Sequence, residues 1–234
     1  DMNNEQLRLN AQEGDVEAAF LLGKRLLAVR GSAMEGVEYL KEAAKKRHLQ
    51  ACEILGSTFL YGEGGVPQDK RQAMVYYEQA QALGSVTART RLIDLYLDSE
   101  DKAERGLQLL TDAADAGDRK AAARAARLYL TGEVSGVDLE RAAKYALISD
   151  DSAVLFETAE KLDLLDTNEA LRDKMYQKML AKDREGAQLG ISACLALGEL
   201  YRRGKGTKAD GRSAERLFLR AIELEKQQVM SEPK

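Results

Sequence analysis

The sequence repeats one pattern six times, and this repeat constrains the fold more than any other feature. Each copy has an Ala or Val, then Leu-Gly or a substitute four and five positions later, and a large residue eight positions later. The copies begin at Ala18, Ala51, Ala88, Ala121, Val154 and Ala193. Spacings of i, i+4 and i+8 lie on one face of a helix. Each copy therefore predicts one amphipathic helix, named helix A below.

A second pattern lies between the copies of the first and predicts another helix, named helix B below. It consists of paired large residues followed by small ones, as in Tyr39-Leu40 before Ala43-Ala44. Helix pairs that recur every 33 to 39 residues form a solenoid, in which each unit packs mainly on its neighbours. The chain is thus expected to be all-α, a right-handed superhelical α-solenoid of about six helix pairs.

The repeat also predicts the domain organisation. We expect one solenoid domain over residues 1–225, with repeats starting near residues 15, 48, 85, 118, 151 and 190. Residues 1–13 are expected to be the end of a capping helix, because "NAQEGD" at 10–15 overlays on "AADAGD" at 113–118. Residues 226–234 are expected to be a polar tail. Only two prolines occur in 234 residues, which suits helices.

A glycine-rich stretch, "LYGEGGVPQD" at residues 60–69, could be a phosphate-binding loop or an inter-helix turn. A phosphate-binding loop needs G-x-x-x-x-G-K-[ST] after a strand. This stretch follows a predicted helix and returns at repeat spacing, at 130–138 and 201–210. Glycine suits the left-handed end of a helix, and the aspartate that closes each stretch is placed to cap the next helix. We interpret all three as inter-helix turns.

Residues 51–84 resemble the Sel1-like repeats, relatives of the tetratricopeptide repeat. The family pattern is A-x-x-x-L-G-x-x-Y-x-x-G-x-G-V-x-x-D-x-x-K-A-x-x-Y-Y-x-x-A-A-x-x-G. The matching residues are Ala51, Leu55, Gly56, Phe59, Gly62, Gly64, Val66, Asp69, Arg71, Ala73, Tyr76, Tyr77, Ala80 and Gly84. The other repeats depart from the pattern: the glycine loop is long in repeats two, four and six and short in one, three and five.

The resemblance implies a bacterial protein, commonly of the cell envelope or periplasm, although the cytoplasm stays open. It implies a protein–protein interaction scaffold or adaptor, with an immunity or inhibitor protein against a secreted toxic effector among the roles. The alternative is a carbohydrate- or peptidoglycan-binding scaffold. That role needs exposed aromatic residues, but Trp is absent and most of the nine Tyr fall at repeat core positions.

Several classes of function are disfavoured by the residues present. His48 is the only histidine, and no Ser, Cys or Asp constellation at catalytic spacing accompanies it. We therefore expect no enzyme, no catalytic residue, no cofactor and no metal site. A net charge of -4 disfavours nucleic-acid binding, and no run approaches the ~20 apolar residues that span a bilayer.

The two cysteines are not expected to form a disulfide. Cys52 and Cys194 occupy equivalent positions in repeats two and six. Four helix-pair layers of about 9 to 10 Å would separate them by roughly 40 Å. A disulfide needs Cα atoms within about 7 Å.

The predicted partner is another protein, bound through the helix A faces that line the concave groove in tetratricopeptide-like superhelices. Carrying that surface over predicts these contact residues: Phe20, Lys24, Tyr61, Asp94, Asp98, Arg127, Phe156, Glu160, Leu195, Glu199, Arg202 and Arg203. For Phe20 and Phe156 the alternative is packing against the next helix A. The edge formed by the three long loops is a second candidate surface.

Charge is segregated along the chain. Residues 94–118 and 150–173 each hold eight acidic side chains against two basic ones, whereas the last repeat is basic. Such polarity can steer a partner of opposite pattern. The alternative is a merely solvated face.

Overall fold

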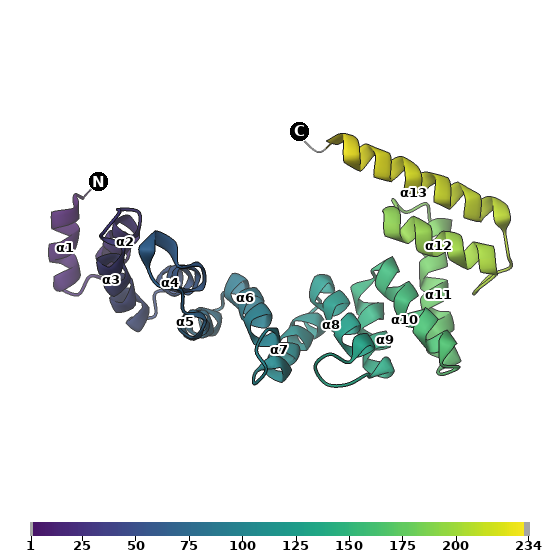
Figure 1. The fold of residues 1–234 in the computed structure, drawn as a ribbon, viewed down its shortest axis with the longest axis horizontal. Coiled ribbons are helices and arrows are strands. Elements are labelled where there is room, and N and C mark those ends of the chain that lie inside the picture. The colour runs from purple at the N-terminus through teal and green to yellow at the C-terminus, as the bar shows by residue number, and fades with distance from the viewer. Residues whose placement is uncertain (1, 232–234) are drawn as a thin grey trace. The chain divides into compact units, whose positions relative to one another are not determined.

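The computed structural model describes residues 2–231, which form thirteen α-helices and one short 3-10 helix (Figure 1). Helix α1 is Asn4–Gln12. The six A helices are α2 (Val16–Leu27), α4 (Leu49–Tyr61), α6 (Val86–Leu97), α8 (Arg119–Thr131), α10 (Ser152–Leu164) and α12 (Ile191–Arg203). The six B helices are α3 (Ala33–Lys45), α5 (Lys70–Ala82), α7 (Ala103–Asp115), α9 (Leu139–Ser149), α11 (Glu169–Arg184) and α13 (Gly211–Ser231). The all-α repeat architecture expected from the sequence is confirmed.

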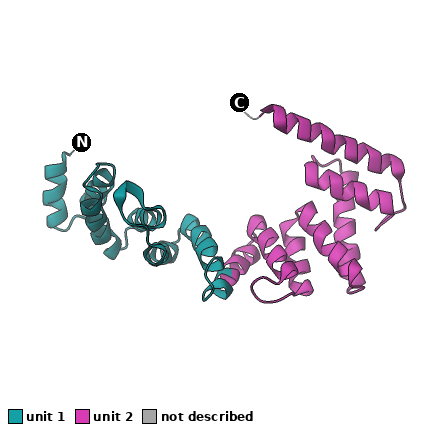
Figure 2. Ribbon diagram, viewed as in Figure 1, with its two compact units in different colours: residues 1–106 teal, residues 107–234 magenta. Residues whose placement is uncertain are grey.

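The helices group into two compact units, residues 1–106 and 107–234 (Figure 2). The boundary falls inside α7, so unit 1 contains α1 to α6 and unit 2 contains α8 to α13. Each unit has its own buried core. In unit 1, Leu7 of α1 packs with Ala18, Leu22 and Leu26 of α2. The amino-terminal helix thus covers the first helix A, in the way a preceding helix B would.

Polar side chains cap the start of five of the six A helices; the exception is α12, whose N-cap is Gly190. Asp15, Asp118 and Asp151 each accept hydrogen bonds from two backbone N–H groups of the helix that follows. Ser85 caps α6 through its hydroxyl, which accepts from the Ala88 N–H at 2.9 Å. The imidazole of His48 does the same for α4, with Nδ1 accepting from the Ala51 N–H at 3.2 Å. These caps satisfy backbone donors that lack a partner within the helix.

Glycine lets helices A and B approach closely. A Cβ at Gly23 would lie 2.8 Å from the carbonyl oxygen of Gly36 and 2.7 Å from Leu40 Cγ. The glycines at the same place in repeats two and six, Gly56 and Gly198, lie against aromatic rings of helix B instead. Their helix-propensity cost of ~1 kcal/mol is offset by this packing, as the sequence predicted.

The glycine-rich stretches are inter-helix turns. Gly62, Gly132 and Gly204 end α4, α8 and α12 with φ of 70°, 76° and 69°. Asp69 then caps α5, accepting from the N–H groups of Arg71 and Gln72. The interpretation as turns is therefore confirmed.

The last helix is longer than the sequence pattern alone indicates. α13 has 21 residues and runs to Ser231, so residues 226–231, expected to belong to a polar tail, are helical. Residues 232–234 of that expected tail lie outside the described residues.

Candidate protein-binding surfaces

The predicted contact residues occupy recurring places on helix A. The stacking position, two residues after the first residue of the repeat, holds Phe20, Phe156 and Leu195. The middle position, six residues after it, holds Lys24, Asp94, Arg127, Glu160 and Glu199. The end position, ten residues after it, holds Tyr61, Asp98 and Arg203, and Arg202 precedes it.

The stacking position joins consecutive repeats in unit 1. Phe20 is only 4% exposed, and its ring stacks on the imidazole of His48 with 4.3 Å between centroids. In the next repeat, Glu53 accepts a hydrogen bond from the Ser85 hydroxyl at 2.5 Å. His48 and Ser85 are both the N-cap of the following helix A. Of the two alternatives for Phe20, the structure shows packing against the next repeat. Phe20 is therefore not available as a surface contact.

The same position differs between the two later repeats that carry a large apolar residue there. Phe156 is half-buried in α10. Leu195 of α12 is 48% exposed. The tight packing of Phe20 in unit 1 is thus not repeated at these two positions.

The middle and end positions of unit 1 are exposed. Lys24 and Asp94 lie on the surface of α2 and α6. Tyr61, the last residue of α4, is 55% exposed. Asp98 accepts from Lys70 Nζ at 3.0 Å, in an ion pair that is itself exposed. A half-exposed phenol ring in charged surroundings is the main apolar feature of this surface.

In unit 2 the equivalent side chains bind one another across repeats. Arg203 Nη1 lies 2.5 Å from Glu160 Oε2, which joins α12 to α10. Arg203 Nε also lies 3.1 Å from Glu199 Oε2. Lys205, in the loop after α12, binds Asp163 at the end of α10. The predicted contacts Glu160, Glu199 and Arg203 are thus part of one intrachain ion network.

This network shifts the ionisation of its acids. The hydrogen bond from Lys205 holds the pKa of Asp163 below its ordinary value, and Arg172, 3.0 Å away, adds to this. Arg202 lowers the pKa of Glu199 in the same way. Arg127 is also paired across repeats, with Nε 3.3 Å from Glu157 Oε2. Two acids of the stretch 150–173, Glu160 and Asp163, are therefore paired with the basic last repeat.

A second cluster of ions in unit 2 surrounds Asp150, which the sequence did not single out as a site. Asp150 Oδ1 lies 3.2 Å from Lys182 Nζ and 3.4 Å from Lys178 Nζ. Burial opposes ionisation of this carboxyl, but the two lysines outweigh burial and lower its pKa. The cluster ties α9 to α11 and has a structural role.

The long loops of repeats two and six pack on the repeat before them. In repeat two, a Cβ at Gly64 would lie 3.0 Å from the Ala33 Cβ and from the Leu27 oxygen. In repeat six, Gln177 Nε2 donates to the Gly206 oxygen at 2.6 Å. The loop of repeat two thus lies against the short turn of repeat one, and the loop of repeat six lies against α11. The loops of repeats two and six are therefore packed connections, although they lie at the surface.

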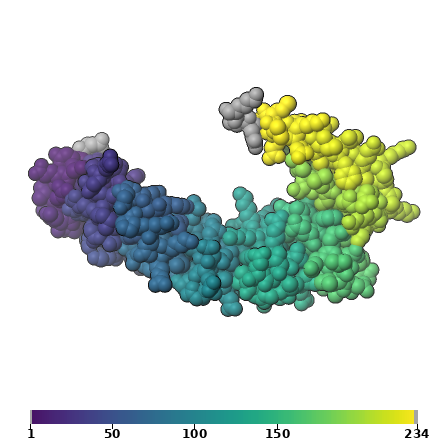
Figure 3. Space-filling model, viewed as in Figure 1, coloured from purple at the N-terminus to yellow at the C-terminus, as the bar shows by residue number. Residues whose placement is uncertain are grey.

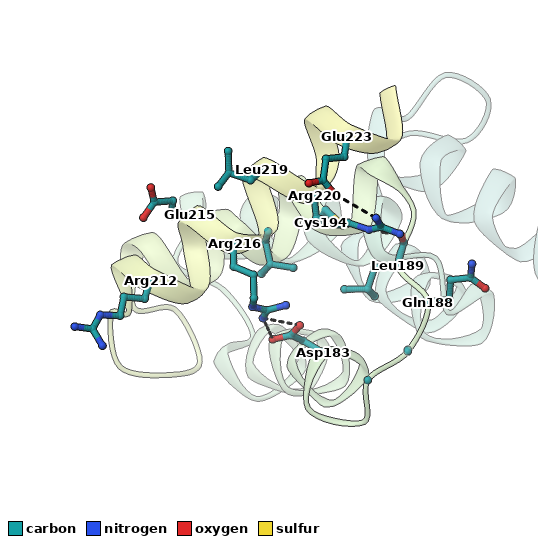
Figure 4. Close-up of a pocket in the computed structure, with 13 residues that line it drawn as sticks. Asp183, Gln188, Leu189, Cys194, Arg212, Glu215, Arg216, Leu219, Arg220 and Glu223 are labelled. Carbon is teal, nitrogen blue, oxygen red and sulfur yellow. Dashed lines mark hydrogen bonds and ion pairs between the residues drawn. The ribbon is translucent and has the colours of Figure 1, made fainter. Parts of the chain in front are cut away.

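An open pocket of about 710 Å³ lies between the segment 186–189 and α13 in unit 2 (Figure 4). Arg216 Nη2 binds both oxygens of Asp183, at 2.9 and 2.8 Å, and Arg220 lies 3.3 Å from Glu223. Cys194 lines the pocket, and burial raises the pKa of its thiol. This pocket was not predicted from the sequence, in which the only related signal is the long interval of 39 residues before the last repeat.

The described residues contain no cluster suited to hold a metal ion. Within 2–231, no three His, Cys, Asp or Glu side chains come together for this purpose. His48 is engaged as a helix cap, with Nε2 3.2 Å from Glu17. Cys52 and Cys194 are buried, free thiols, one in each unit. Over the same residues, no helix is both long and apolar enough to cross a membrane.

Stacked helix pairs, close glycine contacts and glycine turns define an all-α repeat solenoid. The sequence model of the Sel1 repeat matches residues 16–48, 49–85, 119–149 and 191–225, and the chain belongs to this family. The family predicted from residues 51–84 is confirmed. The stretches outside these matches include repeats three and five, where Leu-Gly is replaced by Leu92-Ile93 and Thr158-Ala159.

Two solved structures show the same fold. A Sel1 repeat protein from Oxalobacter formigenes has a TM-score of 0.74 and 21% identity, over 94% of this chain and 65% of that one. The protein c5321 of uropathogenic Escherichia coli, described as a protective antigen displaying an SLR fold, has a TM-score of 0.57 and 21% identity, over 94% and 48%. This chain spans less than two thirds of either. Among curated proteins no match was found.

Membership of the family defines the general class of function. Sel1 repeats generally mediate protein–protein interaction, and proteins built from them are generally non-enzymatic scaffolds. The choice between candidate surfaces then depends on which side chains are free to meet a partner.

Proposed function

We propose that this chain is a non-enzymatic adaptor that binds another protein through the helix A surface of unit 1. The observation that carries the proposal is Tyr61, 55% exposed at the end of α4. Tyrosine is among the residues that most often dominate binding energy, because its ring is apolar and its hydroxyl stays hydrogen-bonded. Lys24 and the Lys70–Asp98 pair supply charge on the same unit.

The helix A surface of unit 2 is a weaker candidate. To bind a partner, Arg203 or Glu160 would have to leave an ion pair at 2.5 Å. The binding free energy would then be only the difference between the new ionic contact with the partner and the intrachain contact that is lost. The exposed phenol of Tyr61 loses no intrachain ion pair on binding, so its full desolvation favours the complex.

The proposed setting is the bacterial cell envelope or periplasm, on the strength of the family resemblance. There the adaptor would hold a component of a secretion or export assembly, or act as an immunity protein that covers a secreted toxic effector. The expected partner surface has an apolar cleft for Tyr61 with polar groups at its rim. A carbohydrate-binding role is less well supported, because six of the nine Tyr are buried.

The experiment is capture of partners from native lysate with the full chain as bait, followed by mass spectrometry. One stoichiometric protein is expected, and Tyr61→Ala should weaken its binding at least about tenfold, as truncation of a central tyrosine does. Val86→Ala is the matched control, because it truncates a side chain of unit 1 that is 62% exposed but lies at the start of α6.

Circular dichroism should show that both variants keep the wild-type helix content, since neither side chain is in the core. Partner binding by Tyr61→Ala at wild-type strength would reject this surface. Retention of the bait on glycan or peptidoglycan resin, with no protein captured, would favour the carbohydrate-binding alternative.

A further inference from the structure

One phenol group of unit 1 is buried without a hydrogen-bond partner. Tyr77 of α5 is only 3% exposed. Its ring lies against α4, since a Cβ at Gly56 would come within 2.6 to 2.9 Å of three ring atoms. In the described residues, the polar side-chain atoms sealed from solvent without a partner are Thr58 Oγ1 and Asp150 Oδ1. The Tyr77 hydroxyl is not among them, so it reaches the surface.

Other buried tyrosines show which group usually meets such a hydroxyl in this chain. The hydroxyl of Tyr176 donates to Glu160 at 3.0 Å, and Arg203 binds the same carboxylate at 2.5 Å. Three more hydroxyls each donate to a carboxylate that a basic side chain also binds: Tyr96 to Glu78 with Arg105, Tyr145 to Asp115 with Lys144, and Tyr201 to Asp183 with Arg216. The usual arrangement is thus a carboxylate between a phenol and a cation.

Repeat two lacks the carboxylate of this arrangement. The place of Glu160, the middle position of helix A, is taken by Ser57, whose hydroxyl donates to a carbonyl oxygen of its own helix at 3.0 Å. The remaining buried tyrosine, Tyr129, is bonded to Arg141. Tyr77 is therefore the one buried tyrosine of the described residues whose hydroxyl has no partner.

The cation of the arrangement is present in unit 1. Arg91 of α6 is exposed and forms no ion pair or hydrogen bond within residues 2–231. Burial raises the pKa of Tyr77 to about 12, and the nearby charge of Arg91 opposes this rise. Like Arg203, Arg91 comes from the helix A of the next repeat. Helix α5 contacts both α4 and α6, and the three helices form one continuous surface (Figures 1 and 3).

We propose that the partner of this chain places a carboxylate, from an aspartate or glutamate side chain, between the Tyr77 hydroxyl and the Arg91 guanidinium. This inference rests on the proposed function, and it states which chemistry the partner presents beside Tyr61. The hydroxyl donates one hydrogen bond, and the guanidinium supplies further donors and the opposite charge. Both groups would then have the partner that Glu160 provides within the chain in repeat five.

Two acidic side chains near Tyr77 make Arg91 essential for this binding. Glu53 and Glu63 add to the high pKa of Tyr77, so its hydroxyl stays protonated and can donate. Glu53 already accepts from Ser85 at 2.5 Å. Both acids repel an incoming carboxylate, which therefore binds only where the guanidinium is present. A partner that presented a lysine instead would bind these acids and would not need Arg91.

A carboxylate supplied by the chain itself tests the site without a partner. Ser57→Glu adds it at the position that Glu160 has in repeat five. Double-mutant cycles with Tyr77→Phe and with Arg91→Gln should each show a coupling of about three- to tenfold in the unfolding equilibrium constant, measured in urea. Ser57→Gln, of the same size but uncharged, is the control and should show little coupling to Arg91→Gln.

The Tyr77→Phe chain should keep its fold. Phe218 already occupies the same place in repeat six, where its ring lies against Gly198. Circular dichroism and the urea midpoint check this expectation. A loss of binding in this variant therefore reports the missing hydroxyl.

Binding of the captured partner gives the second measurement. Tyr77→Phe should weaken it about three- to tenfold and Arg91→Gln at least about tenfold, as expected for a hydrogen bond to a charged group and for an ion pair that holds it. Tyr76→Phe is the matched control for the phenol, since Tyr76 stacks on Phe59 instead. Arg71→Gln, at the exposed start of α5, is the control for charge.

The two measurements separate this inference from the proposed function. Absence of coupling between Ser57→Glu and both Tyr77→Phe and Arg91→Gln would overturn the carboxylate site, whatever the partner is. Partner binding that Tyr61→Ala weakens, but that Tyr77→Phe and Arg91→Gln leave unchanged, would also overturn it and would keep the proposed function. Partner binding that none of the three variants weakens would reject the helix A surface of unit 1, and this inference with it.

Discussion

The helix A surfaces of the two units use the same repeat positions differently. At the end position, Tyr61 of unit 1 is 55% exposed, whereas Arg203 of unit 2 is bound to Glu160 at 2.5 Å. At the middle position, Lys24 is exposed and Glu160 accepts from both Arg203 and the Tyr176 hydroxyl. A repeat position thus determines where a side chain lies. The neighbouring repeat determines whether that side chain is free to bind a partner.

The largest expected effect concerns the stacking position. Phe20→Ala should lower the free energy of unfolding by about 3 to 5 kcal/mol, because it removes a buried ring and its stack on His48. Leu195→Ala changes the same position in unit 2, where the side chain is 48% exposed, and should cost less than about 1 kcal/mol.

Urea unfolding of each variant, with hydrogen exchange to locate the change, gives the measurement. The exchange of α2 and α4 should accelerate in Phe20→Ala, while α12 should respond little to Leu195→Ala. Equal losses of stability would show that Phe20 is not part of the inter-repeat packing.

The next effect concerns the small residue at which helix A meets helix B. Gly23→Ala should destabilise unit 1 by about 1 to 3 kcal/mol, although alanine is the better helix former, because its Cβ would lie 2.8 Å from the Gly36 carbonyl oxygen. Unit 2 already accommodates a methyl group at this place, since Ala126 is fully buried.

The reverse change, Ala126→Gly, should therefore also destabilise, by about 1 kcal/mol from helix propensity alone. Thermal unfolding followed by circular dichroism compares the two variants with wild type. A Gly23→Ala chain more stable than wild type would mean that the helices can separate at little cost.

The sequence was sufficient for the parts of this structure that depend on local periodicity and capping. Each helix A starts one residue after a predicted repeat start, and Gly62 ends α4 in the left-handed region that glycine favours. Local rules were enough for these features. The length of α13 was not predicted, since residues 226–231 were expected to be a polar tail although "EKQQVM" at 225–230 favours helix.

The candidate surfaces were harder to predict, because they depend on contacts between repeats. Glu160 and Arg203 are 43 residues apart, and only the stacking of α10 and α12 shows that they meet. Both the acidic stretch and the basic last repeat are visible in the sequence, which left open whether they steer a partner or form a merely solvated face; it did not show that they pair with each other. The sequence likewise did not show whether Phe20 faces a groove or the next repeat. The structure decides this, because the Phe20 ring stacks on His48 of the next repeat.

The smallest effect tests the ion network through pH. Asp163 has a lower pKa in the folded chain than in the unfolded one, since Lys205 and Arg172 stabilise its ionised form. That stabilisation is present in full above the unfolded value of about 4 and is lost as the pH falls through the lower folded value. Unit 2 should therefore become less stable below about pH 4, and Asp163→Asn should remove part of this dependence.

The matched control lies in unit 1, where Asp98 pairs with Lys70 through side chains that are 70% and 59% exposed. Asp98→Asn should leave the pH dependence unchanged, since so exposed a pair is screened by water. For Asp163→Asn the difference from wild type at neutral pH should not exceed about 1 kcal/mol, and it should shrink as the pH falls toward 3. Parallel curves for Asp163→Asn and wild type would show that the ion pairs of Asp163 add no stability to unit 2.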